Sequence, residues 1–237
     1  MVLVIGHRGA AGYEPENTMR SFRRAVELGC HMLELDVHLA RDGELVVMHD
    51  ETVDRTTNGS GRVSGMETGE LMKLDAGKGE RIPLLTEVLD VFGGACDLNV
   101  ELKGRDTSGP AAELLVSYIN KGAWKREALL VSSFSPVELK DFSELGTGIP
   151  AAVLIDGIPH GAEEFAVELG CAAVHPNHLH LEPDFVRTCH DLGLRVNVWT
   201  PNTREEMGRC LRMGVDGLIT DLPDTALEMI SLHGSDP

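Results

Sequence analysis

Short apolar runs that end in polar or charged residues recur along the chain, and segments of helical periodicity separate them. Helical segments such as Thr18–Leu28 and Ser135–Leu145 begin at Thr or Ser and end beside Gly. The strand-like runs are Val2–Ile5, Met32–Val37, Leu98–Leu102, Ala128–Val131, Ala151–Ile155, Ala172–Val174, Leu194–Val198 and Gly217–Ile219. Alternating strands and helices favour a parallel sheet. Eight strand–helix units predict a (β/α)8 barrel, or TIM barrel, with a doubly wound open sheet as the alternative.

One further apolar run, Glu44–Met48, does not fit this alternation. Only residues 40–43 separate it from the second strand, whereas a parallel crossover needs about a dozen residues or more. We therefore expect an antiparallel hairpin here. Residues from about 40 to 82 then form a small insertion between the second strand and the second helix, which we expect to cap the barrel mouth. The strand–helix alternation outside this insertion predicts one barrel domain, which spans residues 1–237.

The charge balance excludes several classes of partner. Lys and Arg number 21 and Asp and Glu number 38, so the net charge is −17. Proteins that bind nucleic acids or anionic lipid need a basic face, so we expect no nucleic-acid partner and no stable membrane association. The same charge repels a phosphate-bearing substrate unless the site holds a cation.

Targeting signals and cysteine spacing indicate the compartment. Four apolar residues precede Gly6, too few for a signal peptide, and no stretch approaches the ~18 apolar residues of a membrane-spanning helix. The five cysteines are scattered and form no CxxC pair, which is typical of free thiols in an intracellular protein. We therefore expect a cytoplasmic protein.

Three carboxylates at strand ends form a candidate cation site. Glu34 and Asp36 are two residues apart on one predicted strand, so both side chains point to the same face. Glu101 stands on the next strand of the predicted barrel. An oxygen-only set of ligands suits Mg²⁺ or Ca²⁺ rather than Zn²⁺. The alternative is that these residues are ordinary acids near the barrel rim.

Two histidines and two cations stand at the ends of the same predicted strands. His7 and His49 are candidates for acid–base chemistry, because histidine titrates near neutral pH. Arg8 and Lys103 offer positive charge and donors that match phosphate oxygens, or form ion pairs with the nearby acids. Phosphodiester cleavage needs this combination: charge neutralisation, a proton donor for the leaving alcohol and a base for the nucleophile. No nucleophile elbow, dinucleotide-binding loop or Walker loop is present in the sequence.

Motifs around these residues follow one another in a fixed order. They are Gly6–Gly9, Pro15–Thr18, Glu34–Leu39, Asp42–Gly43, Val46–Asp50, Asp54–Gly59, Ile82–Leu85, Asn99–Lys103, Ser132–Phe134, Val196–Thr200 and Gly214–Asp221. By this series the chain resembles the glycerophosphodiester phosphodiesterase family over essentially its whole length. The resemblance implies a TIM barrel with an insertion after the second strand. It also implies hydrolysis of glycerophosphodiesters to glycerol 3-phosphate and a free alcohol, a reaction of lipid and glycerol metabolism.

The resemblance also implies roles for individual residues. Those that match the family's site are Glu34, Asp36 and Glu101 for a divalent metal, His7 and His49 for the general acid and base, and Arg8 and Lys103 for the phosphate. Mg²⁺ is the first choice of metal, with Ca²⁺ and Mn²⁺ as alternatives. A small-molecule glycerophosphodiester is the expected partner. The leaving alcohol, attack by water or by the substrate's own 2-hydroxyl, and the oligomeric state, a homo-oligomer included, stay open.

Other residues near the strand ends have two interpretations each. Trp199 either walls a glycerol pocket or packs at the rim, and we favour the wall. Glu16 and Asn17 either cap the first helix or support His7. The resemblance implies that Arg55 and the Gly- and Thr-rich insertion shape the mouth of the site. Three histidines resemble a metal cluster, but no acid accompanies them, so we expect no site there; they are His175, His178 and His180.

Two other functions fit parts of the pattern. A phospholipase C- or D-like enzyme that acts on lipids would need an interfacial apolar or basic segment, and the sequence shows none. A non-catalytic barrel that binds phosphodiesters would be expected to lack part of the set of acids, histidines and cations, and that set is complete. A metal-dependent phosphodiesterase is therefore the favoured prediction.

Overall fold

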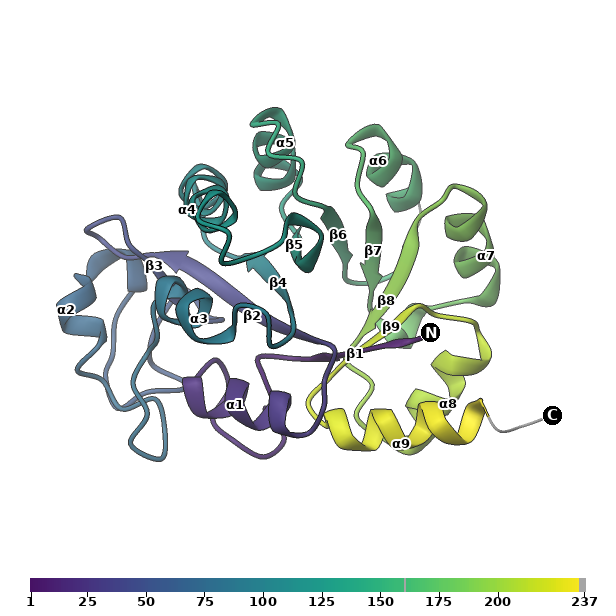
Figure 1. Cartoon of the computed structure of the whole chain (residues 1–237), viewed down its shortest axis with the longest axis horizontal. Coiled ribbons are helices and arrows are strands. Elements are labelled where there is room, and N and C mark those ends of the chain that lie inside the picture. Colours follow the sequence, from purple (N-terminus) through teal and green to yellow (C-terminus); the bar gives the residue numbers. More distant parts are fainter. Residues whose placement is uncertain (160, 235–237) are drawn as a thin grey trace.

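Eight parallel strands close into a barrel with helices on its outside (Figure 1). The structure is a computed structural model and describes residues 1–159 and 161–234. The barrel strands are β1 (Leu3–Gly6), β2 (Met32–Leu39), β4 (Asp97–Leu102), β5 (Leu129–Ser133), β6 (Ala151–Ile155), β7 (Ala173–Pro176), β8 (Arg195–Trp199) and β9 (Gly217–Thr220). The barrel closes through β1, where Ile5 pairs with Met32 of β2 and with Ile219 of β9. The predicted TIM barrel is therefore confirmed.

The helices begin at the capping residues that the sequence provides. Thr18, Ser135 and Thr203 accept hydrogen bonds from backbone N–H groups in the first turns of α1, α5 and α8. The α-helices are α1 (Met19–Glu27), α2 (Thr68–Leu71), α3 (Leu85–Phe92), α4 (Ser108–Asn120), α5 (Pro136–Glu144), α6 (Ala162–Glu168), α7 (Pro183–Asp191), α8 (Arg204–Arg212) and α9 (Pro223–His233). Short 3-10 helices are η1 (Val63–Gly65), η2 (Arg126–Ala128) and η3 (His178–His180). No helix among the described residues is long and apolar enough to cross a membrane.

The segment after β2 turns back on itself. Strand β3 (Leu45–Val47) pairs antiparallel with β2, with Val47 opposite Val37, as the short connection predicts. Residues that follow β3 contain η1 and α2 and return to the barrel at α3. The segment buries an apolar cluster of its own, which consists of Ala40, Val46, Met48, Val53, Val63, Leu71, Ala76 and Ile82. This cluster gives the insertion a fixed conformation beside the barrel.

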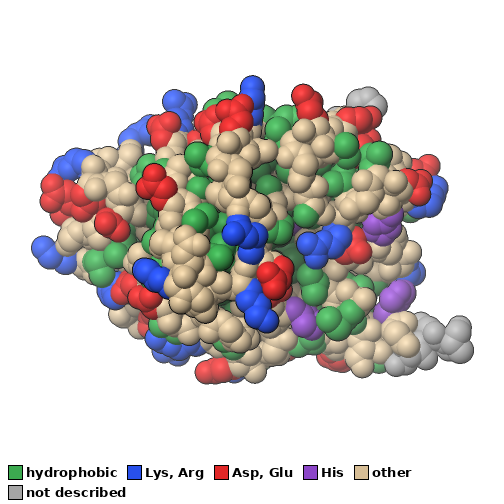
Figure 2. Space-filling model, turned by 45° about the horizontal axis from the view of Figure 1, so that its top comes forward, with side chains coloured by type: hydrophobic (Ala, Val, Ile, Leu, Met, Phe, Trp, Pro, Cys, Tyr) green, Lys and Arg blue, Asp and Glu red, His purple; other side chains and the backbone are tan. Residues whose placement is uncertain are grey.

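Alternation along β2 positions the acids. Leu33 and Leu35 belong to the core between the strands and the helices, so Glu34 and Asp36 point into the barrel. A separate apolar cluster packs inside the barrel and consists of Ile5, Met32, Leu130, Ala152, Ala173 and Ile219. The other charged side chains lie mostly outside. Figure 2 shows acidic and basic side chains interspersed over one face, without a patch of a single sign.

Candidate active site

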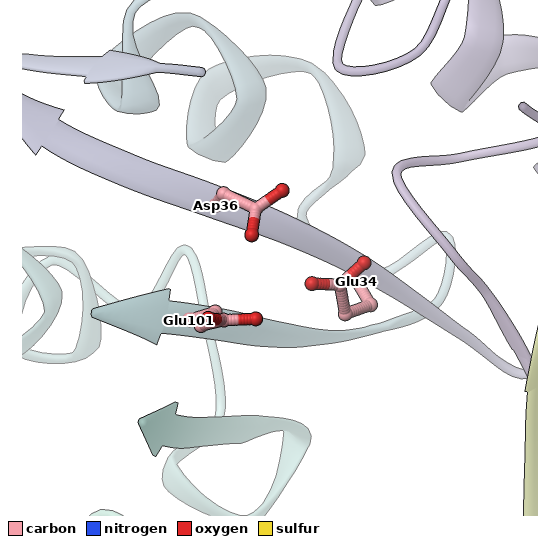
Figure 3. A group of neighbouring side chains, drawn as sticks. All are labelled: Glu34, Asp36 and Glu101. Carbon is pink, nitrogen blue, oxygen red and sulfur yellow. The ribbon is translucent and has the colours of Figure 1, made fainter. Parts of the chain in front are cut away.

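Three carboxylates meet inside the barrel. Asp36 on β2 pairs in register with Glu101 on β4, and Glu34 lies two residues earlier on β2. One oxygen from each carboxylate lies within 4.8 Å of the others, and all three residues are buried. Figure 3 shows the side chains from the two strands pointing toward one another. The group that the sequence proposes as a cation site is therefore assembled by the parallel register of two neighbouring strands.

The electrostatics of this cluster favour a bound cation. Burial and the charge of Asp36 raise the pKa of Glu101 to about 8, and burial with the same neighbour raises that of Glu34 well above its usual range. Asp36 Oδ1 is buried and accepts no hydrogen bond from the described part of the chain. A divalent cation would offset the repulsion and bond the free oxygen, and oxygen ligands suit a hard ion. These residues therefore fit a divalent metal.

His7 is held by a carboxylate from the far end of the chain. It follows β1, and its backbone N–H donates to the carbonyl of Thr220 at 2.9 Å. Its Nδ1 lies 2.7 Å from Asp221 Oδ1. Although burial opposes ionisation, hydrogen bonds from His7 and Asn202 lower the pKa of Asp221. The ionised carboxylate fixes the imidazole and leaves its Nε2 for other groups.

His49 is held in the same way by its sequence neighbour. Its Nδ1 lies 2.5 Å from Asp50 Oδ1. Burial, together with the positive charges of Arg8 and Lys103, lowers the pKa of His49 and outweighs the opposing effect of Asp36 and Asp50. The lowered pKa favours the neutral ring, whose Nε2 can accept a proton.

Two cations flank the acidic cluster. Arg8 donates its backbone N–H to Glu34 Oε2 at 2.8 Å, and its Nε lies 3.4 Å from Asp36 Oδ2. Lys103 Nζ lies 2.8 Å from Glu101 Oε1. The loop that carries Arg8 has left-handed backbone, with φ of 50° at Arg8 and 87° at Gly9. A Cβ at Gly9 would lie 2.5 Å from Ser21 Oγ, so only glycine allows the loop to pack on α1.

Arg55 links both sides of the site from within the insertion. Its Nη1 and Nη2 each lie 2.8 Å from a carboxylate oxygen of Glu16, which also accepts a 2.8 Å bond from Arg8. Its Nε donates to Asp50 Oδ2 at 2.7 Å and its Nη2 to Asp50 Oδ1 at 3.0 Å. One guanidinium therefore holds the carboxylate that orients His49 and the carboxylate that orients Arg8.

These groups surround a cavity of about 310 Å³. It is lined by His7, Arg8, Glu34, His49, Asn99, Glu101, Lys103, Ser132, Phe134, Leu154, Asp156, Trp199 and Ile219. Trp199 packs edge-on against Phe134, with ring centroids 5.5 Å apart, and its Nε1 donates to the carbonyl of His175 at 2.8 Å. The cavity thus has a charged side on β1, β2 and β4 and an aromatic side on β5 and β8.

The structure brings the proposed site residues together. Every one of them except Asp36 lines the cavity, and Asp36 completes the acidic cluster beside it. The aspartates that hold the two histidines, Asp50 and Asp221, have no role in the sequence interpretation. Asp50 directly follows His49, and Asp221 directly follows β9, the strand that closes the barrel on β1. Their positions at the ends of predicted strands could therefore have indicated a role.

The weaker sequence interpretations have different outcomes. Thr18 caps α1, while Glu16 bonds Arg8 and Asn17 Nδ2 donates to Asp36 Oδ2 at 2.8 Å. Among the described hydrogen bonds, neither residue contacts His7, because Glu16 binds the cations Arg8 and Arg55 and Asn17 binds the acid Asp36. His175 is enclosed within the barrel, whereas His178 accepts from Arg209 of α8, so this sequence cluster forms no common ligand set among the described residues.

A closed parallel barrel with a buried acidic cluster, two carboxylate-bound histidines and two cations in one cavity defines a TIM-barrel enzyme. Comparison with known proteins then identifies the family. The chain belongs to the glycerophosphoryl diester phosphodiesterase family, whose model matches residues 7–225.

Individual relatives agree over nearly the full length. The chain is 38% identical to a glycerophosphodiester phosphodiesterase of Caldanaerobacter subterraneus subsp. tengcongensis over 240 residues, which cover 98% of this chain and 99% of the relative. It is 32% identical to one of Bacillus subtilis, covering 94% and 84%. A solved structure of an Oleispira antarctica phosphodiesterase, in complex with the product sn-glycerol-3-phosphate, superposes with a TM-score of 0.89 at 30% identity, covering 97% and 96%.

Proposed function

We propose that this protein hydrolyses glycerophosphodiesters to sn-glycerol 3-phosphate and an alcohol by metal-assisted acid–base catalysis. The observation that carries the proposal is the meeting of Glu34, Asp36 and Glu101 with two carboxylate-bound histidines in one cavity. The family membership and the product complex of the Oleispira antarctica relative support the same reaction.

The acidic cluster would hold the divalent ion, with Mg²⁺ as first choice and Ca²⁺ or Mn²⁺ as alternatives. When bound, this ion supplies positive charge that neutralises the phosphodiester and polarises its P–O bonds. Arg8 and Lys103 would hold the other phosphate oxygens, because each places its cationic group beside the cluster. This local charge overcomes the repulsion that a net charge of −17 imposes on an anionic substrate.

The two histidines would divide the proton transfers between them. His49, whose pKa is lowered by burial, would accept the proton of the attacking hydroxyl at Nε2. His7 would donate a proton to the leaving alcohol from Nε2, since Asp221 at its Nδ1 balances the positive charge of the protonated ring. Asp221 and Asp50 therefore act by positioning the rings.

The proposal extends to the surroundings of the reaction. Trp199, packed on Phe134, would wall the glycerol moiety on the side opposite the acids. Residues 1–237 would act as one domain, with the 40–82 insertion covering the mouth through Arg55. We further propose a cytoplasmic enzyme of lipid and glycerol metabolism that acts on water-soluble substrates.

A panel of glycerophosphodiesters tests the proposal. We expect release of sn-glycerol 3-phosphate from the wild-type protein with Mg²⁺, Ca²⁺ or Mn²⁺, and loss of release with a chelator. His7→Ala and His49→Ala should each lower kcat by about a thousandfold or more while circular dichroism shows an intact fold. Absence of turnover with every metal would refute the reaction, and full activity of either variant would refute its role.

A further inference from the structure

Two polar side chains in the cavity lack hydrogen-bond partners among the residues that the structure describes. Asn99 on β4 and Ser132 on β5 line the cavity and are completely buried. Neither Asn99 Nδ2, Asn99 Oδ1 nor Ser132 Oγ has a hydrogen-bond partner in the described part of the chain. Buried amides and hydroxyls are almost always bonded, so a pair with every polar atom free points to a ligand.

The strand register places this pair directly beside the acidic cluster. Asn99 pairs with Glu34, and Ser132 pairs with Glu101. Asn99 also precedes Glu101 by two residues on β4, so both point into the barrel. A ligand group bound to Asn99 and Ser132 would therefore lie beside a phosphate held at the cluster, so both groups would belong to one substrate molecule.

The chemistry of the pair selects the kind of ligand group. An amide and a hydroxyl offer both donors and acceptors, which matches an alcohol hydroxyl. A second anionic group is disfavoured by the neighbouring carboxylates of Glu34 and Glu101. Leu154 and Ile219, which also line the cavity, offer no competing side-chain hydrogen bonds.

We propose that Asn99 and Ser132 bind a free hydroxyl of the glycerol moiety and thereby set the preference for glycerol-bearing phosphodiesters. This inference rests on the proposed function and specifies its substrate selection. A site whose buried polar groups bond a substrate hydroxyl rejects analogues that lack the hydroxyl, because those groups then remain unpaired.

Ser132→Ala tests the inference, with Ser133→Ala as a matched control. Ser133 is equally buried, but its hydroxyl donates to the carbonyl of Leu102 at 2.7 Å. The assay compares kcat/KM for sn-glycero-3-phosphocholine with kcat/KM for bis(4-nitrophenyl) phosphate, a phosphodiester without glycerol. We expect Ser132→Ala to lower the ratio of the two values about tenfold, mainly through KM for the glycerol substrate. Ser133→Ala should leave the ratio within about twofold, since it removes no ligand contact.

Binding measurements separate this inference from the proposed reaction. Calorimetry with sn-glycerol 3-phosphate and with methyl phosphate requires no turnover. We expect Ser132→Ala and Asn99→Ala to weaken the first ligand about tenfold more than the second. Equal weakening of both ligands, or an unchanged substrate ratio in Ser132→Ala, would overturn the inference. Weaker binding of Mg²⁺ alone to Asn99→Ala would also overturn it, because Asn99 would then serve the metal.

Discussion

His7 and Asp221 are 214 residues apart in the sequence, yet His7 Nδ1 lies 2.7 Å from Asp221 Oδ1. Closure of the barrel causes this proximity, because β1 pairs with β9 and Gly6 stands opposite Thr220. The last strand thus supplies the carboxylate that orients a residue after the first strand. A barrel left open between β1 and β9 would separate the two groups.

Asp221→Asn tests the orienting role of this carboxylate. We expect kcat for glycerophosphodiesters to fall by about a hundredfold or more, since the amide neither fixes the imidazole tautomer nor balances its charge. Asp224→Asn is the control, because the Asp224 carboxylate accepts from the Tyr13 hydroxyl at 2.8 Å on the surface. That control should stay within about twofold of the wild type. Equal activity of Asp221→Asn and the control would remove Asp221 from the mechanism.

The loss of activity at low pH should report the protonation of His49. Its pKa lies below the ordinary 6.5, and a base must be unprotonated to act, so activity is present above this pKa and lost as the pH falls through it. We expect kcat/KM to decline with a midpoint below 6.5. Asp50→Asn removes a hydrogen bond that raises the pKa of His49, so the midpoint should move to still lower pH. A midpoint that moves upward would contradict the assignment.

Arg55→Ala should uncouple the insertion from the site. Loss of the guanidinium removes one support from Asp50 and one from Glu16, so we expect kcat/KM to fall about tenfold, within the range for groups that support ligands and catalytic residues. Arg62→Ala is a matched control in the same insertion, since Arg62 pairs only with exposed Glu51 among the described residues. If both variants behave alike, Arg55 has no positioning role.

Thermal stability without metal should fall as the pH rises. Glu101, with a pKa of about 8 in the folded protein, holds its proton between pH 4.5 and 8 while the unfolded chain has lost it. Stability therefore decreases with rising pH over this window. Mg²⁺ at 100 times its Kd at pH 8 should raise Tm by about 5–10 °C at that pH. The same Mg²⁺ concentration should raise Tm less at pH 5, where protons on Glu34 and Glu101 compete with the metal.

Differential scanning calorimetry with chelator and with Mg²⁺ provides this measurement. Glu101→Gln is the informative variant, because it removes the charge that burial penalises. We expect it to flatten the decline of stability with pH and to reduce the stabilisation by Mg²⁺. A wild-type Tm that Mg²⁺, Ca²⁺ and Mn²⁺ each leave unchanged at pH 8 would show that the cluster holds none of these metals.

Glu138 stabilises the fold and takes no part in the proposed reaction. This buried carboxylate on α5 accepts from the backbone N–H groups of Asp106 and Ser108 at 2.7 and 2.9 Å, and so fixes the start of α4. We expect Glu138→Ala to cost about 2–4 kcal/mol and to lower Tm by about 5–10 °C. Exposed Glu144, on the same helix, should change stability by less than about 0.5 kcal/mol when replaced by alanine. Similar Tm values for the two variants would contradict the capping role.

The sequence by itself determined the barrel and the acidic cluster. Apolar runs and helical periods are local signals, and they located the strands and the antiparallel hairpin after β2. The two-residue spacing of Glu34 and Asp36 fixes a shared face, and parallel register brings Glu101 beside them. The shared face follows from strand geometry, which depends on residues near one another in the chain, and the order of strands in the predicted barrel places Glu101 on the neighbouring strand.

Only the tertiary structure decided which groups hold the site residues and which polar groups stay free. Asp221 reaches His7 through closure of the barrel, and Arg55 reaches Glu16 across 39 residues through the fold of the insertion. Within the described part of the chain, the same packing leaves the Asn99 side chain without a hydrogen-bond partner, while it bonds the Ser133 hydroxyl to the Leu102 carbonyl. Such contacts depend on how loops and strands from distant parts of the chain meet. A local sequence pattern does not determine which distant residues come into contact.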